Sequence, residues 1–147
     1  MKIVLYIVMA LGMINTFAGA GWMNLSPEAC DRYGKGTCHL GKSYTCGCLG
    51  SLKRAETICR RVGGRLPTLN ELKRVTQSCG LRAKMYGHNR VGRKFDNCIS
   101  AKGFRRGKYW SKSRSKDIPG ARASLDFRRA EIDSLGLLDK GYIGCVR

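Results

Sequence analysis

The chain has 147 residues, which is enough for one domain with a modest core. Its 28 lysines and arginines against 10 acidic residues give a formal net charge of +18. The enzyme signatures HExxH and GxSxG do not occur, and no pair of catalytic carboxylates is evident. Composition and motifs therefore argue against an enzyme and favour a protein that binds a polyanion, with a role of the charge in solubility as the alternative.

The first twenty residues are predicted to be a cleaved signal peptide. Lys2 is their only charge, residues 3–11 are almost wholly apolar, and Ala18-Gly19-Ala20 supplies the small residues of a cleavage site. A membrane anchor is the competing interpretation, but the apolar run is short for a span and no basic stop signal follows it. No cysteine follows the cut to carry a lipid anchor. We therefore expect a secreted or periplasmic protein whose mature chain begins at Gly21.

All eight cysteines lie in the predicted mature chain, and in an oxidising compartment this even number predicts four disulfides among 105 possible pairings. Cys46 and Cys48 are expected to bond different partners, because a ring closed between them would be strained. A zinc site is the alternative, but His39 and His88 do not provide the spacing of zinc ligands. We expect no metal and no cofactor. The predicted disulfide cysteines are Cys30, Cys38, Cys46, Cys48, Cys59, Cys79, Cys98 and Cys145.

The first element predicted in the mature chain follows a loop-rich, cysteine-dense leader at residues 21–50. Ser51 can cap a helix, and Gly63 and Gly64 end it. The apolar positions of this helix fall on one face at 3.6-residue spacing, and they are Leu52, Ala55, Ile58, Cys59 and Val62.

A second helix is predicted directly after Pro67. Thr68 and Glu71 have the spacing of a capping box, in which each side chain accepts a hydrogen bond from the other residue's backbone. Gly80 is the expected end of this helix. Its predicted buried stripe is Leu69, Leu72, Val75 and Cys79.

Residues 81–107 lack a periodic pattern, contain several glycines and are predicted to form a long loop with no evident role in the core. A bridge between Cys79 and Cys98 would hold this loop in place, which favours a functional loop over a disordered one.

Strands are predicted at residues 108–111, 122–127, 131–135 and 142–146, with a turn at residues 128–130. Two helices followed by a small antiparallel sheet make an α+β domain.

The basic residues concentrate between residues 81 and 116, where twelve of them face one acid, Asp96, and the net charge is +11. A field of one sign over so short a stretch is usually directed at a polyanion. We therefore predict that this stretch binds the ligand, with most of the attraction from Arg90, Arg93, Lys94, Arg105, Arg106 and Lys108. The full set of predicted ligand-binding residues is Arg82, Lys84, Arg90, Arg93, Lys94, Lys102, Arg105, Arg106, Lys108, Lys112, Arg114 and Lys116.

Four motifs in a fixed order carry a resemblance to a known family over residues 51–147. They are Arg65-Leu66-Pro67-Thr68 with Glu71-Leu72, then Tyr109-Trp110-Ser111, then Leu125-Asp126-Phe127, and finally Cys145-Val146-Arg147. This order resembles the carboxy-terminal domain of the Legionella collagen-like adhesin, the Lcl or DUF1566 family, which is similar to the C-type-lectin-like fold. The resemblance implies a disulfide between Cys59 and Cys145 that joins the first helix to the last strand. Closing a loop of that length would stabilise the fold by roughly 4 kcal/mol.

The chain departs from the family pattern at several positions. Lys112 stands where a second serine is usual, Gly144 where an arginine often precedes the last cysteine, and Gly64 where a tryptophan is usual. The cysteine-rich leader at residues 21–50 has no counterpart in the family. The side chains of Leu66, Trp110, Phe127 and Val146 are expected in the core and Arg65 in a local hydrogen bond or ion pair. Asp126 is expected either to pair with a buried arginine or to face solvent.

The family resemblance implies an adhesin-like, secreted module that binds carbohydrate, with sulfated glycosaminoglycans as one ligand class. The charge predicts an anionic ligand independently, so we expect a sulfated or otherwise acidic glycan. Two alternatives remain open, a toxin or antimicrobial effector that acts on an anionic membrane or cell wall, and an extracellular nucleic-acid binder. Against lipid, no amphipathic helix with a basic face is predicted, and against nucleic acid, the basic stretch interleaves few aromatic residues, Tyr86, Phe95 and Phe104.

Overall fold

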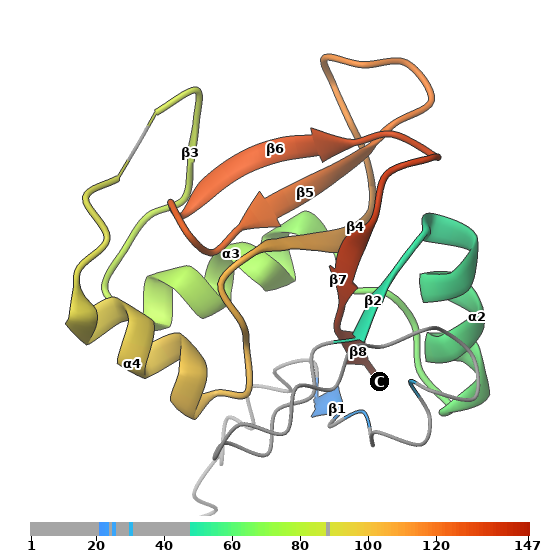
Figure 1. The fold of residues 1–147 in the computed structure, drawn as a ribbon, viewed down its shortest axis with the longest axis horizontal. Coiled ribbons are helices and arrows are strands. Elements are labelled where there is room, and N and C mark those ends of the chain that lie inside the picture. Colours follow the sequence, from blue (N-terminus) through green and yellow to red (C-terminus); the bar gives the residue numbers. More distant parts are fainter. Residues whose placement is uncertain (1–20, 24, 26–29, 31–47, 88) are drawn as a thin grey trace, which may run out of the picture.

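A computed structural model describes residues 21–23, 25, 30, 48–87 and 89–147. The predicted signal peptide, Cys38, Cys46 and both histidines lie outside the described residues. Within those residues the fold is α+β, as the sequence predicts, and three helices surround a twisted sheet (Figure 1). None of the helices described here has the length and apolar character needed to cross a membrane.

The strands are, in chain order, β1 (Trp22–Met23), β2 (Cys48–Gly50), β3 (Lys84–Met85), β4 (Lys108–Arg114), β5 (Arg122–Asp126), β6 (Glu131–Leu135), β7 (Gly141–Ile143) and β8 (Cys145–Val146). Six of them form one sheet in the order β2-β7-β4-β5-β6-β3, and β1 pairs with β8 beside it. The predicted strands at 108–111, 122–127 and 131–135 are confirmed as β4, β5 and β6, with the predicted turn between β5 and β6.

The prediction of a purely antiparallel sheet is wrong. β7 runs parallel to β4, with Tyr142 opposite Tyr109, and β3 runs parallel to β6. The predicted closing strand at 142–146 is split into β7 and β8 at Gly144, where an added Cβ would lie 3.1 Å from the ring of Trp22. The leader therefore contributes two strands that the sequence did not predict, β1 against β8 and β2 against β7.

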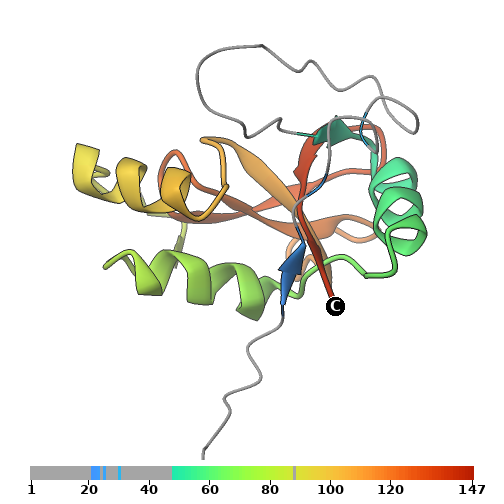
Figure 2. The ribbon, with the colours of Figure 1, turned by 90° about the horizontal axis from the view of Figure 1, so that it is seen from below.

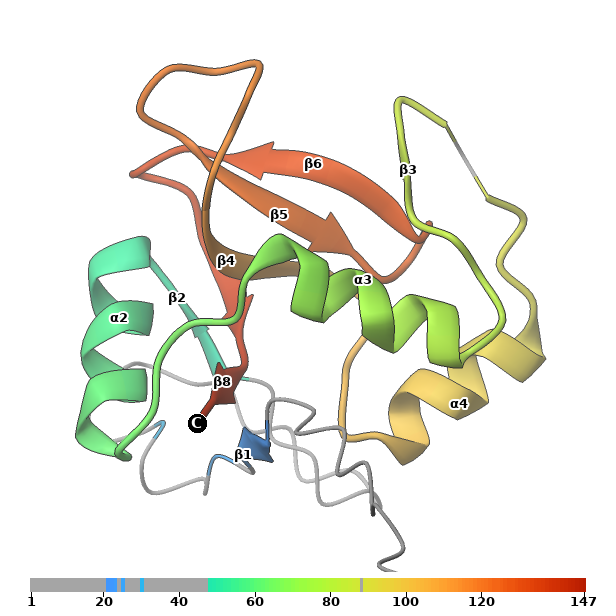
Figure 3. The same ribbon diagram turned by 180° about the vertical axis from the view of Figure 1, so that it is seen from behind.

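The helices are α2 (Leu52–Arg61), α3 (Leu69–Ser78) and α4 (Arg93–Ala101). α3 lies below the sheet and contacts β4 and β5, while α2 and α4 lie at opposite ends of the molecule (Figures 2 and 3). The predicted stripe of α2 is confirmed, but Ser51 stands at the N-cap without a side-chain hydrogen bond. The predicted capping box of α3 is confirmed, because Thr68 Oγ1 accepts from the Glu71 amide and Glu71 Oε2 accepts from the Thr68 amide.

The prediction that residues 81–107 form a loop without a core role is wrong, because α4 occupies the middle of that stretch. Phe95 and Ile99 lie one helical turn apart on its buried face, and Phe104 is buried just beyond its end. Gly92 is the N-cap of α4, and Gly103 follows its last turn with φ of +84°. These glycines are boundaries of a short helix, although in the sequence they resemble loop residues.

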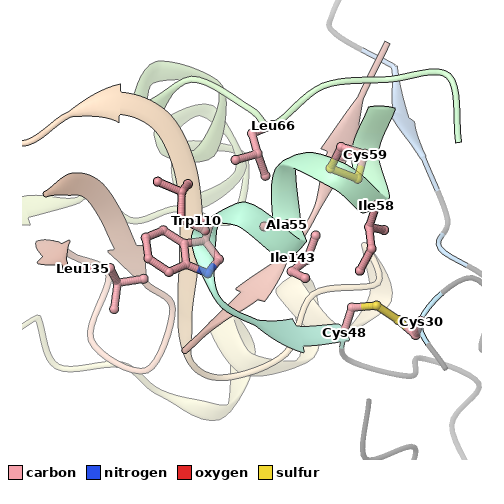
Figure 4. Close-up of a cluster of buried hydrophobic side chains, with 11 residues drawn as sticks. Cys30, Cys48, Ala55, Ile58, Cys59, Leu66, Trp110, Leu135 and Ile143 are labelled. Atoms are coloured by element: carbon pink, nitrogen blue, oxygen red, sulfur yellow. A yellow bond between two sulfur atoms is a disulfide. The ribbon is translucent and has the colours of Figure 1, made fainter. Parts of the chain in front are cut away.

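The core has two parts that meet at β4. One lies between α2, β2 and β7 and surrounds Trp110 (Figure 4). The other lies between α3, α4 and the sheet, where Phe104, Tyr109 and Phe127 have ring centroids 5.0 to 5.4 Å apart. Burial of the four predicted core side chains is confirmed for Leu66, Trp110, Phe127 and Val146.

Three disulfides are present among the described residues. Cys59 in α2 bonds Cys145 in β8, as the family resemblance implies, and Cys79 bonds Cys98 in α4, the bridge that the sequence analysis considered without predicting. Cys48 bonds Cys30, which confirms that Cys46 and Cys48 do not bond each other (Figure 4). Several disulfides in a small domain are typical of secreted or periplasmic proteins.

Candidate functional site

The twelve predicted ligand-binding residues lie in three segments of the chain, and the first and third segments meet at one cleft, which Met85, Arg114 and Lys116 line. Five lie between the end of α3 and the first turn of α4, four between the end of α4 and the start of β4, and three at the end of β4 and just beyond it. β4 has seven residues, so its two ends lie about 20 Å apart. In chain order the groups are Arg82, Lys84, Arg90, Arg93 and Lys94; Lys102, Arg105, Arg106 and Lys108; and Lys112, Arg114 and Lys116.

Two of the twelve cations already bind acids of the fold. Arg106 Nε lies 3.3 Å from Asp96 Oδ1, which joins the start of β4 to α4, and Lys108 forms an ion pair with Asp133 of β6. Burial opposes ionisation of Asp133, but its hydrogen bond with Lys108 and a backbone hydrogen bond lower its pKa on balance. The amide of Arg105 donates to the buried Tyr109 hydroxyl at 2.8 Å.

Of the remaining ten cations, the nine other than Arg105 form no ion pair with an acid in the part of the chain that the structure describes. All nine are exposed. The acids are engaged elsewhere: Glu56, Asp126 and Glu131, for example, pair with Arg122, Arg128 and Arg129. The nine unpaired cations are Arg82, Lys84, Arg90, Arg93, Lys94, Lys102, Lys112, Arg114 and Lys116.

A hollow of about 400 Å³ brings one of these cations, Lys102, next to Arg74 of α3. Its apolar lining includes Trp22 and Phe104, whose rings meet edge to face with centroids 4.8 Å apart. An aromatic lining with cations beside it can contact the apolar face of a sugar ring and an acidic substituent together. The sequence reasoning missed Trp22 and Arg74, because both lie outside the basic stretch and only the fold brings them to Lys102.

The RLPT motif has a structural role. Arg65 forms two parallel hydrogen bonds with Glu71, at 2.9 and 2.8 Å, which confirms the predicted local ion pair. This pair and the capping bond of Thr68 lower the pKa of Glu71 to about 2, although burial opposes the shift. Asp126 likewise pairs with Arg128, an exposed rather than a buried arginine. These two acids therefore anchor turns of the fold.

Replacing Glu71 with glutamine is expected to lower the free energy of unfolding at neutral pH. It should also make that free energy depend less on pH between pH 7 and pH 2. The folded pKa of Glu71 lies below its ordinary value of 4.5, so its charge stabilises the fold above about pH 4.5 and that contribution is lost as the pH falls toward 2. Glutamine keeps an acceptor for the cap but loses the charge, at a cost of about 1 to 2 kcal/mol at pH 7. Urea unfolding at pH 7 and near pH 2 measures this.

The free energies of the wild-type protein and Glu71→Gln should converge near pH 2. A matched control is Glu56→Gln, because Glu56 is half-exposed and 3.5 Å from its partner Arg122, so its loss should cost little at any pH. A difference for Glu71→Gln that is the same at pH 7 and pH 2 would contradict the assigned role of the charge.

Within the described residues, no three or more His, Cys, Asp or Glu side chains are grouped so that they could hold a metal ion. The two hollows gather cations and hydroxyls, and one of them gathers aromatic rings. The acids that line them, Glu71, Asp117 and Asp133, interact with Arg65, Tyr86 and Lys108, so the cations and hydroxyls suit the binding of an anion. No family model, no curated protein and no solved structure that was compared with this chain matches it.

Proposed function

We propose that this protein is a secreted, adhesin-like binding module of the Lcl or DUF1566 kind, with a C-type-lectin-like fold, that binds a sulfated or otherwise acidic glycan on a surface. The order of the four sequence motifs supports the family. The disulfide from α2 to β8, which closes the fold across its core, is consistent with that resemblance.

One observation carries the proposed ligand class: nine exposed cations of one stretch have no acidic partner among the described residues. A chain selected only for solubility can mix both signs on its surface, which avoids the self-repulsion of a one-sided field. The second and third of the three groups lie at the two ends of β4, about 20 Å apart. An extended anionic polymer can contact both groups at once, whereas a small anion cannot.

The first turn of α4 supports the proposal further. Arg93 and Lys94 are exposed there, at the end of the helix where the backbone amides carry partial positive charge. Cations at this end oppose the helix dipole and destabilise the helix slightly. Their presence is explained if they bind a ligand anion, for which an arginine offers two hydrogen bonds in one plane.

Neutralising the α4 entry group, in the variant Arg90→Gln/Arg93→Gln/Lys94→Gln, is expected to lower heparin affinity at least tenfold and leave Tm nearly unchanged. All three side chains are exposed and none supports the core. Binding should also weaken steeply between low and physiological salt, since contacts with a polyanion release condensed counterions. Calorimetric titration with heparin fragments at two salt concentrations measures both effects, with neutral dextran as the blank.

A matched control removes the same charge from α2, in Lys53→Gln/Arg54→Gln/Arg60→Gln, at the opposite end of the molecule (Figure 1). The control should change heparin affinity much less. Equal losses in both variants would mean that net charge alone attracts heparin, and binding that salt does not weaken would remove the polyanion function. Competition with duplex DNA distinguishes the nucleic-acid alternative, because a glycan binder should release DNA first.

A further inference from the structure

The large hydrophobic side chains that remain exposed are gathered on three loops. Among the described residues there are five of them, and the two most exposed are Leu138, with 98% of its surface exposed, and Tyr86, with 79%. The loops are the one after β3, the one between β4 and β5, and the turn between β6 and β7. In chain order the five residues are Met85, Tyr86, Ile118, Leu137 and Leu138.

These three loops lie along one side of the molecule. Arg114 of β4 and Leu135 of β6 both pair with Arg122 of β5, so the β4–β5 loop and the β6–β7 turn leave the sheet at the same end. In Figures 1 and 3 the loop after β3 and the β4–β5 loop project above the sheet and the β6–β7 turn lies at its upper edge, while α3, α4 and the C-terminal end lie below. We call residues 84–87, 114–120 and 136–140 the loop face.

Contacts join the loops to one another. Tyr86 donates a hydrogen bond to the Asp117 carboxylate, which raises the pKa of the tyrosine hydroxyl. The hydroxyls of Ser115 and Ser134 lie 2.7 Å apart and join the β4–β5 loop to β6. Tyr86 also has φ of +52°, a left-handed backbone conformation that is unfavourable for an aromatic residue. An exposed side chain held in this conformation has no role in packing, so its position suggests a role in binding.

A cleft of about 320 Å³ opens between the first two loops and α3. Three cations line it, Lys73, Arg114 and Lys116, together with the hydroxyls of Ser113, Ser115 and Ser134. The two acids that line it are engaged, Asp117 with Tyr86 and Asp133 with Lys108. The cleft therefore offers cations and hydroxyl groups to an anionic group such as a phosphate.

The loop face combines apolar tips with neighbouring cations. Lys84 precedes Met85, Lys116 lies two residues before Ile118, and Lys140 follows Leu138 by two residues. The tips protrude from separate loops and do not form a groove, so a rigid partner protein would need a matching pocket for each. A fluid bilayer accommodates protruding leucines without such pockets, and its anionic headgroups complement the lysines.

We propose that the loop face docks on an anionic phospholipid bilayer, with Ile118, Leu137 and Leu138 inserted among the acyl chains and a headgroup phosphate in the cleft. The loop face shares Lys84, Arg114 and Lys116 with the cations of the proposed glycan function, but its apolar tips are not among those cations, so variants of the tips test the two proposals separately. The sequence argument against lipid considered only amphipathic helices, and it did not consider apolar loop tips, whose exposure depends on the fold.

The test measures co-sedimentation of the mature protein with vesicles of phosphatidylcholine alone and of phosphatidylcholine with 30% phosphatidylglycerol. The wild-type protein should bind the mixed vesicles and not the neutral ones. Leu137→Ser/Leu138→Ser should lower the partition coefficient at least tenfold, while the matched control Leu137→Met/Leu138→Met, which keeps the apolar surface, should bind as wild type. Both leucines are exposed, so Tm and heparin affinity should stay unchanged in either variant.

Insertion is measured separately with Leu138→Trp and lipids brominated on the acyl chain. The brominated lipid should quench the fluorescence of this variant more strongly than that of the wild-type protein, whose only tryptophans are Trp22 and Trp110. Unchanged vesicle binding in the double serine variant, or binding of Leu138→Trp without added quenching, would overturn the proposal and leave adsorption by charge. A shift from dimer to monomer in solution caused by the serine variant would also overturn it, since a second copy of this chain would then cover the face.

Discussion

Replacing Trp110 with alanine is expected to destabilise the protein by about 3 to 5 kcal/mol, the usual cost of removing a fully buried aromatic side chain. The indole of Trp110 lies among Leu66, Leu135 and Ile143 in the core beside α2 (Figure 4). Its Nε1 donates a hydrogen bond of 2.7 Å to the Gly50 carbonyl, which ties β4 to β2 in the leader. Alanine would leave both a cavity and an unpaired buried carbonyl.

Trp110→Phe separates the two contributions, because phenylalanine fills most of the space and cannot donate the hydrogen bond. It should cost clearly less than alanine, with a remainder of about 1 to 3 kcal/mol from the unsatisfied Gly50 carbonyl. Urea unfolding followed by far-UV circular dichroism measures both variants, since each of them lacks one of the two tryptophans on which fluorescence depends. A loss below about 1 kcal/mol for alanine would show that the residue does not fill this core.

Removing the Cys59–Cys145 disulfide, in Cys59→Ala/Cys145→Ala, is expected to cost about 4 kcal/mol. The bridge spans 86 residues, so it strongly restricts the unfolded chain, and both cysteines are fully buried. The matched control is Cys79→Ala/Cys98→Ala, whose bridge spans 19 residues and should contribute about 3 kcal/mol.

The comparison is made by chemical unfolding of the two variants, after peptide mapping shows that the remaining disulfides are native. Removing the longer bridge should lower the free energy of unfolding more than removing the shorter bridge. A smaller loss for Cys59→Ala/Cys145→Ala than for the control would contradict the chain-entropy argument. Peptide mapping of the wild-type protein that joins Cys59 to a leader cysteine would contradict the fold itself.

Local signals made part of the fold predictable from sequence. The capping box at Thr68 and Glu71 involves residues only three apart, so a short stretch of sequence is enough to predict it. The parallel pairing of Tyr109 with Tyr142 joins segments far apart in the chain, and no local pattern encodes it. Helix α4 was missed because one turn, Phe95 to Ile99, is too short a period to recognise between two glycines.

The candidate site was predictable in composition and not in geometry. The excess of cations is visible in the sequence, but the ion pairs of Arg106 and Lys108 depend on how β4 meets α4 and β6. The exposure of Leu138 could not be predicted from the sequence either. Two adjacent leucines usually indicate a buried segment, and only the structure of the turn shows that this pair is exposed.

The position of β1 links export to assembly of the binding surface. Gly21, the expected first residue of the mature chain, accepts a hydrogen bond from the Arg147 amide, and the next residue, Trp22, pairs with β8 and lines the hollow beside Arg74. A peptidase that cut two residues further downstream would remove Gly21 and Trp22. Loss of Trp22 would leave one residue of β1 and would take away an aromatic side chain that lines the hollow. If the predicted signal peptide is removed just before Gly21, the accuracy of the cut would determine whether the proposed ligand site keeps Trp22, and an extension left before Gly21 would start beside that hollow.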